Sequence, residues 1–313
     1  MPGYGGGQRP GVMPRRPMTS KDRKLYDSPV PQSSPGEATS PASGQAAHLA
    51  TLDTGTPHIA RIYDYWLGGD NNFAADREAA ELALAATPTI VPGVRANRRF
   101  LGRAVRFMAG QGVRQFLDIG TGIPATGNTH EVARAVDPSC RVVYVDNDPI
   151  VGAHAQALLR SSAPLVDYIT ADARDTREIL DAAARTLDFS QPAGIMLIAI
   201  LHCIPDEDDP RALVGDLLSA GPPGSYLAIT HPARDQLQAA TKAEESLTRS
   251  MGQKVTFRTR AEVASFFDGL DVEDPGVVPV QDWRPDSDLD RDSLPTAMWG
   301  AVARKPVMNT TGA

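Results

Sequence analysis

The spacing of apolar side chains along the chain changes near residue 112. Before that point, apolar residues recur every three or four positions, which is the period of an amphipathic helix. Glycine and proline residues interrupt this pattern and divide the segment into separate helices. The predicted helices run from Pro57 up to Gly68, from Phe73 through Ala86, and from Pro92 to Gly110.

After residue 112, short apolar runs alternate with segments of helical length that are rich in alanine, leucine and charged residues. The predicted strands are 115–119, 141–145, 165–170, 194–201 and 225–230. The fourth run contains no polar side chain, which is typical of a central parallel strand that is covered on both faces. This repeated alternation predicts a doubly wound parallel sheet with right-handed crossovers.

The end of the chain is less regular. A run at 254–258 precedes a predicted helix over 260–267. Two further runs, 277–280 and 296–303, have no helical segment between them and are predicted to pair antiparallel at a sheet edge. The fold class is therefore expected to be α/β, with a mainly parallel, seven-stranded sheet and an N-terminal helical cap.

Composition limits the part of the chain that can fold. Residues 1–50 contain eight prolines and seven glycines but little periodic apolar sequence, and such a segment buries too little surface to offset chain entropy. We therefore expect a disordered leader over 1–55 and a flexible tail over 306–313. Between them we expect a helical cap or lid over 56–112 and one sheet domain over 113–305.

Charge and cysteine content narrow the possible functions. The chain has a net charge of −7, and residues 1–50 carry +3, which leaves −10 for the remainder. Such an acidic body argues against nucleic acid as a partner, because nucleic-acid binding needs clustered basic residues. Cys140 and Cys203 have no metal-ligand spacing, which predicts no metal site, no disulfide and a reducing compartment. No apolar signal region follows the arginines near the start of the sequence, so the expected location is the cytoplasm. No apolar run is long enough to span a membrane.

The strongest chemical signal follows the first predicted strand. The strand delivers Asp118 to the carboxyl edge of the sheet, and Gly120 and Gly122 then let the backbone turn sharply and approach a ligand. The amide groups at the start of the next helix favour an anionic part of that ligand. A tight strand-to-helix turn has the same pattern without any ligand, so this signal alone leaves both interpretations open.

The end of the second predicted strand strengthens the ligand interpretation. Asp146 lies there, and in a doubly wound sheet the tip of the second strand is beside the tip of the first. A carboxylate in this position can accept hydrogen bonds from both hydroxyls of a ribose. Asp148 directly precedes Pro149, so Asp148 is the better candidate for a helix cap. Asp146 is left as the predicted ribose ligand.

Two kinds of nucleoside cofactor fit this arrangement. A dinucleotide usually requires a third spaced glycine, and Ala125 occupies that position. Because alanine is sometimes tolerated there, the spacing does not exclude a nicotinamide cofactor. Asp118 argues against one, since a carboxylate repels a pyrophosphate but complements a positive charge on a ligand.

These turns resemble the motifs of class I S-adenosylmethionine-dependent methyltransferases. Residues 118–122 resemble the first motif of this family, and Asp146 resembles its ribose-binding acid. Residues 171–173 resemble its adenine-binding motif. Residues 201–206, Leu-His-Cys-Ile-Pro-Asp, are similar to a segment of the branch that acts on small molecules. Segments 59–69, 72–78, 95–101 and 120–131 more narrowly resemble an actinobacterial family of S-adenosyl methyltransferases with no assigned substrate, from Pro57 to Ala303.

The resemblance implies a Rossmann-like fold, S-adenosylmethionine as the cofactor and a small-molecule methyl acceptor. It places Asp118 and the glycine turn at the methionine moiety, Asp146 at the ribose, Asp172 with Ala173 at the adenine, and Leu201 beside the sulfonium. The predicted cofactor-binding residues are Asp118, Gly120, Thr121, Gly122, Asp146, Asn147, Asp172, Ala173 and Leu201. The Ile-Pro step at 123–124 departs from the generic turn but matches the narrower family.

Methyl transfer depends mainly on alignment and on exclusion of water, and it needs a general base only if the acceptor loses a proton. His202 and Tyr65 are the candidate catalytic residues, although packing beside the cofactor is the favoured interpretation of His202. The first helix and the turn that follows it also carry polar residues that packing does not readily explain: Arg61, Asp64, Asn71 and Asn72. We expect this helix to close over the cofactor and to form part of the acceptor pocket.

Two alternatives remain open at this point. A non-catalytic regulatory protein would use the same S-adenosylmethionine site without an acceptor. A nicotinamide-dependent oxidoreductase would share the sheet and the ribose acid.

Overall fold

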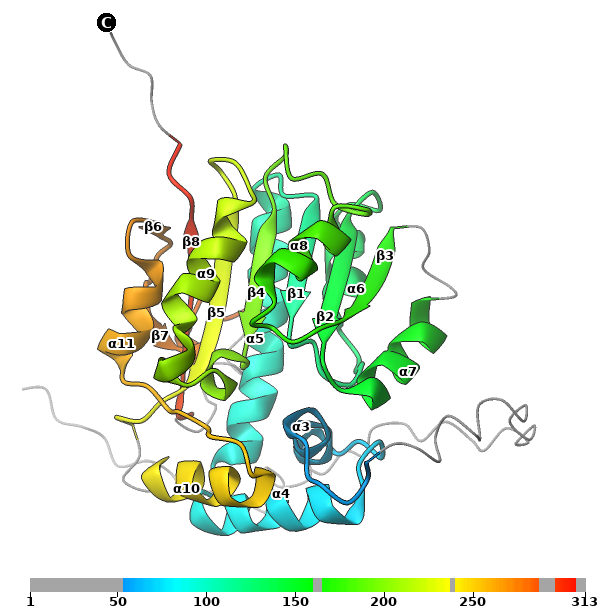
Figure 1. Ribbon diagram of the computed structural model, residues 1–313. Helices are drawn as coiled ribbons and strands as arrows, with labels where there is room; N and C mark the ends of the chain where they lie inside the picture. The colour runs from blue at the N-terminus through cyan, green and yellow to red at the C-terminus, as the bar shows by residue number, and fades with distance from the viewer. Residues whose placement is uncertain (1–52, 160–164, 237–239, 287–295, 308–313) are drawn as a thin grey trace, which may run out of the picture. The chain divides into compact units, whose positions relative to one another are not determined.

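The computed structural model describes residues 53–159, 165–236, 240–286 and 296–307 (Figure 1). The predicted disordered leader and flexible tail lie outside these residues, apart from 53–55 and 306–307. Among the described residues, no helix is both long and apolar enough to cross a lipid bilayer.

A mixed sheet forms the centre of the fold, in the order β3-β2-β1-β4-β5-β8-β6, and β7 also pairs with β8. Its strands are β1 Gln115–Ile119, β2 Arg141–Asp146, β3 Val166–Thr170, β4 Gly194–Ile198, β5 Tyr226–Pro232, β6 Asp271–Val272, β7 Val278–Pro279 and β8 Met298–Arg304. The first five strands are parallel, and β8 is antiparallel to β5, β6 and β7. This confirms the predicted fold class, with β6 and β7 as two short partners of β8.

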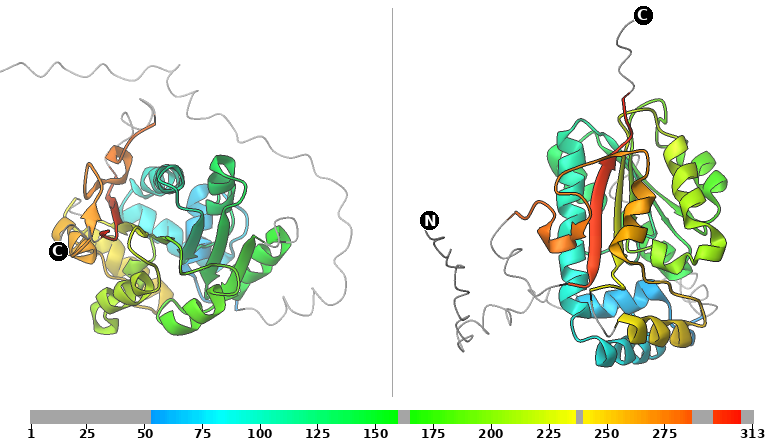
Figure 2. Two further views of the ribbon diagram at one scale, coloured as in Figure 1. Left: turned by 90° about the horizontal axis from the view of Figure 1, so that it is seen from above. Right: turned by 90° about the vertical axis from the view of Figure 1, so that its left-hand side faces the viewer.

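Helices cover both faces of the sheet (Figure 2). They are α3 Ile59–Leu67, α4 Ala74–Ala86, α5 Ile90–Gly110, α6 Thr129–Val136, α7 Pro149–Leu159, α8 Thr176–Ala183, α9 Pro210–Ser219, α10 Ala240–Met251 and α11 Arg260–Ala264. Side chains of α8, α9 and α11 pack on one face, and those of α5 and α6 pack on the other. Ile195 and Met196 of β4 belong to opposite faces, which explains why this strand has no polar residue.

The fourth strand is shorter than predicted. It ends at Ile198 because Ala199 has a φ of 54°, a conformation that non-glycine residues rarely adopt, and a 3₁₀ turn, η1, follows over Leu201–Cys203. The sequence pattern missed this end because the turn is also apolar, and Leu201 is fully buried in the core. The run predicted at 254–258 forms a single bridge, in which Arg258 pairs with Ala233.

A separate helical layer lies at the carboxyl end of the parallel strands and contains α3, α4 and α10 (Figure 1). These helices share an apolar core, although α10 comes from a distant part of the sequence. The long helix α5 connects this layer to the sheet: Val94 packs with α3 and α4, whereas Phe100 and Met108 pack against the strands. The segment 56–112 therefore supplies both the end layer and part of the sheet's cover.

Candidate cofactor site

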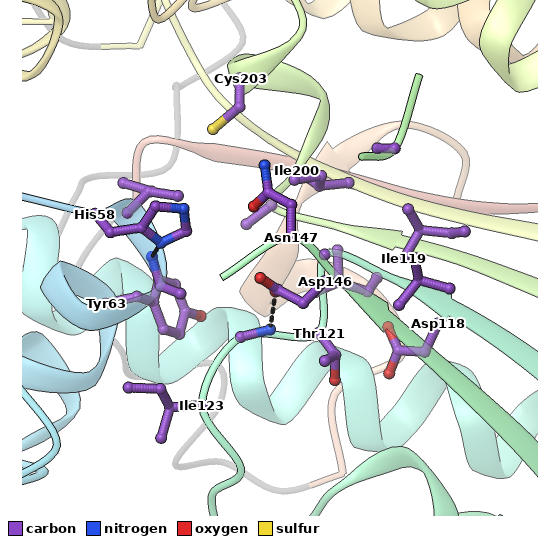
Figure 3. Close-up of a pocket in the computed structure, with 18 of the residues that line it drawn as sticks. His58, Tyr63, Asp118, Ile119, Thr121, Ile123, Asp146, Asn147, Ile200 and Cys203 are labelled. Carbon is purple, nitrogen blue, oxygen red and sulfur yellow. Dashed lines mark hydrogen bonds between the residues drawn. The ribbon is translucent and has the colours of Figure 1, made fainter. Parts of the chain in front are cut away.

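A cleft lies at the carboxyl ends of β1, β2 and β4 and faces α3 (Figure 3). It contains about 1090 Å³ of space, part of which is open to solvent. The predicted cofactor residues that line it are Asp118, Gly120, Thr121, Gly122, Asp146, Asn147, Asp172 and Ala173. Leu201 does not line the cleft but is fully buried in the core, and Ile200 lies at the cleft instead. The turn after Ala199 explains why Ile200, rather than Leu201, lies at the cleft.

The glycine turn has the geometry that its sequence predicts. Gly120 and Gly122 have φ angles of 71° and 66°, which favour glycine. A Cβ on Gly120 would lie 2.6 Å from Cδ1 of Ile200, so this position also has no room for a side chain. The amides of Gly120 and Thr121 donate to the carbonyl of Val145 at 2.8 and 3.1 Å. The turn is therefore fixed against β2.

Asp118 is the second-last residue of β1 and lies inside the protein, with only 4% of its surface exposed. Its carboxylate accepts a hydrogen bond of 2.6 Å from Oγ1 of Thr129, at the start of α6. Burial raises the pKa of Asp118 to about 6, although this hydrogen bond and the charge of Arg98 oppose the shift. The group can therefore supply negative charge near neutral pH in a site that water reaches poorly.

Asp146, the last residue of β2, connects the glycine turn after β1 with the turn between β2 and α7. Its Oδ2 accepts the amide of Gly122 at 2.8 Å, and its Oδ1 accepts the amide of Asp148 at 3.0 Å. Burial raises the pKa of Asp146, and these two hydrogen bonds oppose that shift. Each carboxylate oxygen can accept a second hydrogen bond, so the residue can hold the glycine turn and bind ligand hydroxyls together.

Asp148 connects the second turn to α3. Its Oδ1 accepts the amide of Ile150, which confirms the predicted role as a helix cap. Its Oδ2 lies 3.2 Å from both Nδ1 of His58 and Nε of Arg61. Arg61 is buried and also lies 3.7 Å from Asp76 of α4. These ion pairs hold α3 and α4 against the β2–α7 turn.

The other polar residues of this segment form a second network around Asp64. Its Oδ2 accepts the amide of Asn71 and the side-chain Nδ2 of Asn72, each at 2.9 Å. A Cβ on Gly69 would lie 2.1 Å from Oδ1 of Asp64, so glycine is required at this turn. The network closes the α3–α4 turn, and Asp64 also lines the cleft. The two networks therefore explain the polar residues Arg61, Asp64, Asn71 and Asn72 as contacts that fix α3, which the sequence pattern did not predict.

Asp172 lies at the rim of the cleft after β3. Its carboxylate accepts hydrogen bonds from Nε and Nη2 of Arg174 at 2.8 and 2.6 Å. The hydrogen bonds from Arg174 lower the pKa of Asp172. Arg174 also pairs with Asp208 at 2.9 Å. Arg174 therefore connects Asp172 at the rim to the segment that precedes α9.

The cleft includes polar residues that the sequence analysis did not select. Tyr63 comes from α3, and Asn97 and Arg98 come from α5. Nδ2 of Asn97 donates to the Tyr63 hydroxyl at 2.9 Å, whereas its Oδ1 is buried with no partner among the described residues. The available signal was a polar pair within the otherwise apolar stripe of the third predicted helix.

The two candidate catalytic residues have different positions. A second cavity adjoins this cleft among α3, α5 and α10. Tyr65 lines neither the cleft nor this neighbouring cavity, and its hydroxyl donates to Glu81 at 2.6 Å at the surface. Tyr63, two residues earlier, lines both. His202 is buried and lines the neighbouring cavity rather than the cleft. Tyr65 is therefore not part of the site that we propose below.

A parallel, doubly wound sheet with an acidic glycine turn after β1 and a buried acid after β2 defines a nucleoside-binding α/β protein. The family model for S-adenosyl methyltransferases matches residues 45–306, and the chain belongs to this family. The protein is therefore an S-adenosylmethionine-dependent methyltransferase, as the motifs predict. No curated protein matches the chain.

Two solved structures are similar to this chain over nearly their whole lengths. A DUF574 family protein from Streptomyces avermitilis has 42% identity and a TM-score of 0.77, and the match covers 81% of this chain and 99% of that protein. A methyltransferase candidate from Thermobifida fusca has 40% identity and a TM-score of 0.78, with 82% and 97% covered. Both similarities support the same fold and family.

Proposed function

We propose that the protein transfers a methyl group from S-adenosylmethionine to a small-molecule acceptor, and that the cleft beside β1 and β2 holds the cofactor. The observation that carries this proposal is the convergence of Asp118, Asp146 and the glycine turn on one cleft. When bound, the cofactor supplies a methyl group on a sulfonium. The chain must then align the acceptor and exclude water, which α3 favours by facing the cleft.

The donors and acceptors in the cleft fit such a cofactor. Asp146 has lone pairs left for the ribose hydroxyls, and Asp172 with Ala173 lies at the adenine end. The buried carboxylate of Asp118 complements the positive charges of the methionine moiety. Oδ1 of Asn97, which has no partner in the described part of the chain, suits an ammonium group, and the Arg98 guanidinium suits a carboxylate.

Family membership decides between the alternatives. It favours an enzyme over a non-catalytic regulatory protein, and S-adenosylmethionine over a nicotinamide cofactor. The cytoplasmic location is also part of the proposal. It is supported by two cysteines that are buried and unpaired, as expected in a reducing compartment.

Calorimetry with S-adenosylhomocysteine tests the cofactor assignment. Asp146→Ala removes the predicted ribose acceptor and is expected to weaken binding by about tenfold or more. Asp181→Ala is the matched control, because Asp181 is exposed on α8 and does not line the cleft. Equal affinity of wild type and Asp146→Ala would show that the ribose lies elsewhere.

A further inference from the structure

A second cavity adjoins the cofactor cleft. It contains about 690 Å³ of space and lies among α3, α5, α10 and the ends of β5 and β8. Ile59, Tyr63 and Ala199 line both cavities. These three residues therefore form a common wall, and a molecule in the second cavity would lie next to the cofactor.

The described lining of the second cavity is almost entirely apolar. Its larger members include Trp66, Val94, Leu247, Phe257 and Met298, and it contains no Asp, Glu, Lys or Arg. A charged ligand would lose its hydration there without gaining an ionic partner. The cofactor cleft is the opposite, because it is lined by several acids and two arginines. The two cavities therefore suit different chemical classes of ligand.

One polar side chain in the second cavity lacks the partners that buried groups normally have. His202 is only 5% exposed, and its Nδ1 is buried without a hydrogen-bond partner among the described residues. Burial and the charge of Arg258 lower the pKa of His202 to about 4, so its imidazole is neutral at physiological pH. A neutral imidazole can donate one hydrogen bond and accept one.

Oγ1 of Thr89 gives a second polar position in the same lining. This hydroxyl oxygen is also buried, and it has no hydrogen-bond partner among the residues that the structure describes. Thr89 lines the cavity and directly precedes α5. An apolar cavity with a few polar side chains in its lining is typical of a site that orients an apolar ligand through one or two hydrogen bonds. Packing alone does not explain why these atoms are left unpaired.

We propose that the second cavity binds the methyl acceptor, and that this acceptor is an uncharged, mainly apolar molecule whose hydroxyl or similar neutral polar group contacts His202. The proposal rests on the proposed function, because it places the acceptor beside the cofactor across the wall of Ile59, Tyr63 and Ala199. It excludes phosphorylated and carboxylated acceptors. His202 acts here as a positioning contact with the acceptor.

Filling the cavity tests the proposal directly. Gly93 lines it, and a Cβ there would lie 3.9 Å from Thr296 and 4.0 Å from Met298, which is ordinary contact distance. Gly93→Leu should therefore occupy the cavity without straining α5. Gly215→Leu is the matched control, because Gly215 is an exposed glycine of α9 with nothing near its Cβ position.

The probe is naphthol, an uncharged ring system with one hydroxyl, titrated into protein saturated with S-adenosylhomocysteine. Gly93→Leu is expected to weaken naphthol binding by about tenfold or more, while Gly215→Leu leaves it unchanged. The affinity for S-adenosylhomocysteine should stay within about twofold in both variants. Equal naphthol binding by wild type and Gly93→Leu, or no naphthol binding by the loaded wild type, would overturn the proposal.

Two further comparisons test the polar contact and the charge preference. Wild type should bind naphthol about fivefold more tightly than naphthalene, and His202→Leu should remove this difference. Naphthoate should bind more weakly than naphthol, and stronger naphthoate binding would overturn the proposal. If the wild type did not bind S-adenosylhomocysteine at all, the proposed function would be contradicted instead. A failure of the cofactor assignment can therefore be distinguished from a failure of the acceptor proposal.

Discussion

The two cavities at the carboxyl edge of the sheet are built in different ways. In the cofactor cleft, Asp118, Asp146 and Asp172 lie at or just after the ends of β1, β2 and β3, beside the residues of the glycine turn. The second cavity is assembled from side chains of α3, α5, α10 and β8, which are distant in sequence. A charged cofactor needs polar groups at fixed positions, whereas an apolar ligand needs only a shaped surface. The need for polar groups at fixed positions therefore produces a local sequence motif, whereas the need for a shaped apolar surface does not.

The largest expected effect follows from breaking the ion pairs that hold α3, because α3 contributes to both cavities. Arg61→Ala leaves the buried carboxylates of Asp148 and Asp76 without the Arg61 guanidinium, and only His58 then remains beside Asp148. Removing one partner of a buried pair is expected to lower the free energy of unfolding by about 3–5 kcal/mol. Chemical denaturation measures this change.

Arg177→Ala provides the control for that substitution. Arg177 is 96% exposed and lies 4.0 Å from Asp181, and such surface pairs contribute little to stability. If Arg61→Ala unfolded at the same denaturant concentration as Arg177→Ala, the ion pairs would not hold α3 in place.

The next effect should be confined to the cofactor cleft. Gly120→Ala brings a Cβ to within 2.6 Å of Ile200 and adds strain at a φ of 71°. We expect S-adenosylhomocysteine binding to weaken by about a hundredfold in calorimetry. Gly127→Ala has similar strain, at a φ of 79°, but nothing lies near its Cβ position. Similar losses in both variants would mean that strain, rather than contact with Ile200, fixes the turn.

The difference between the cavities explains how far the sequence could be interpreted. The parallel arrangement of the first five strands was predictable, because each strand is an apolar run and a helical segment follows it. The residues at the strand tips were predictable for the same reason. Asp118 and Asp146 line the cleft because parallel strands bring their carboxyl ends to one edge.

What the sequence did not predict depends on side-chain direction and on distant contacts. Leu201 was expected at the cofactor, but the turn at Ala199 directs it into the core and leaves Ile200 at the cleft. Asn97 was missed because its helix was identified from apolar positions alone. The packing of α10 against α4 joins segments that no local pattern connects.

The pH dependence of Asp118 should separate the cofactor cleft from the neutral cavity. S-adenosylmethionine carries a positive charge, so its affinity is expected to rise as the pH increases through about 6, where Asp118 becomes ionised. Arg98 and Asp146 also act on this carboxyl group. Calorimetry from pH 5 to 8 measures the change, and Asp118→Asn should flatten the profile. Naphthol binding should not change across this range.

The same group has the opposite effect on the free protein. Below pH 3.8 Asp118 is protonated in both the folded and unfolded chain, whereas between 3.8 and about 6 only the unfolded chain ionises. The contribution of Asp118 to the free energy of unfolding therefore falls as the pH rises through this window. A cofactor affinity that rose with pH equally in Asp118→Asn would assign the dependence to another group.

The smallest effect concerns the two tyrosines of α3. Tyr63→Phe removes the hydroxyl that accepts Nδ2 of Asn97 and leaves this buried amide without that partner, so cofactor affinity should fall by about threefold. Tyr65→Phe removes only an exposed hydrogen bond to Glu81 and should leave the affinities for S-adenosylhomocysteine and naphthol unchanged. Calorimetry on the two variants tests the orientation of α3. If Tyr65→Phe had the larger effect, the helix would present its other face to the cofactor, and the wall between the two cavities would consist of different residues.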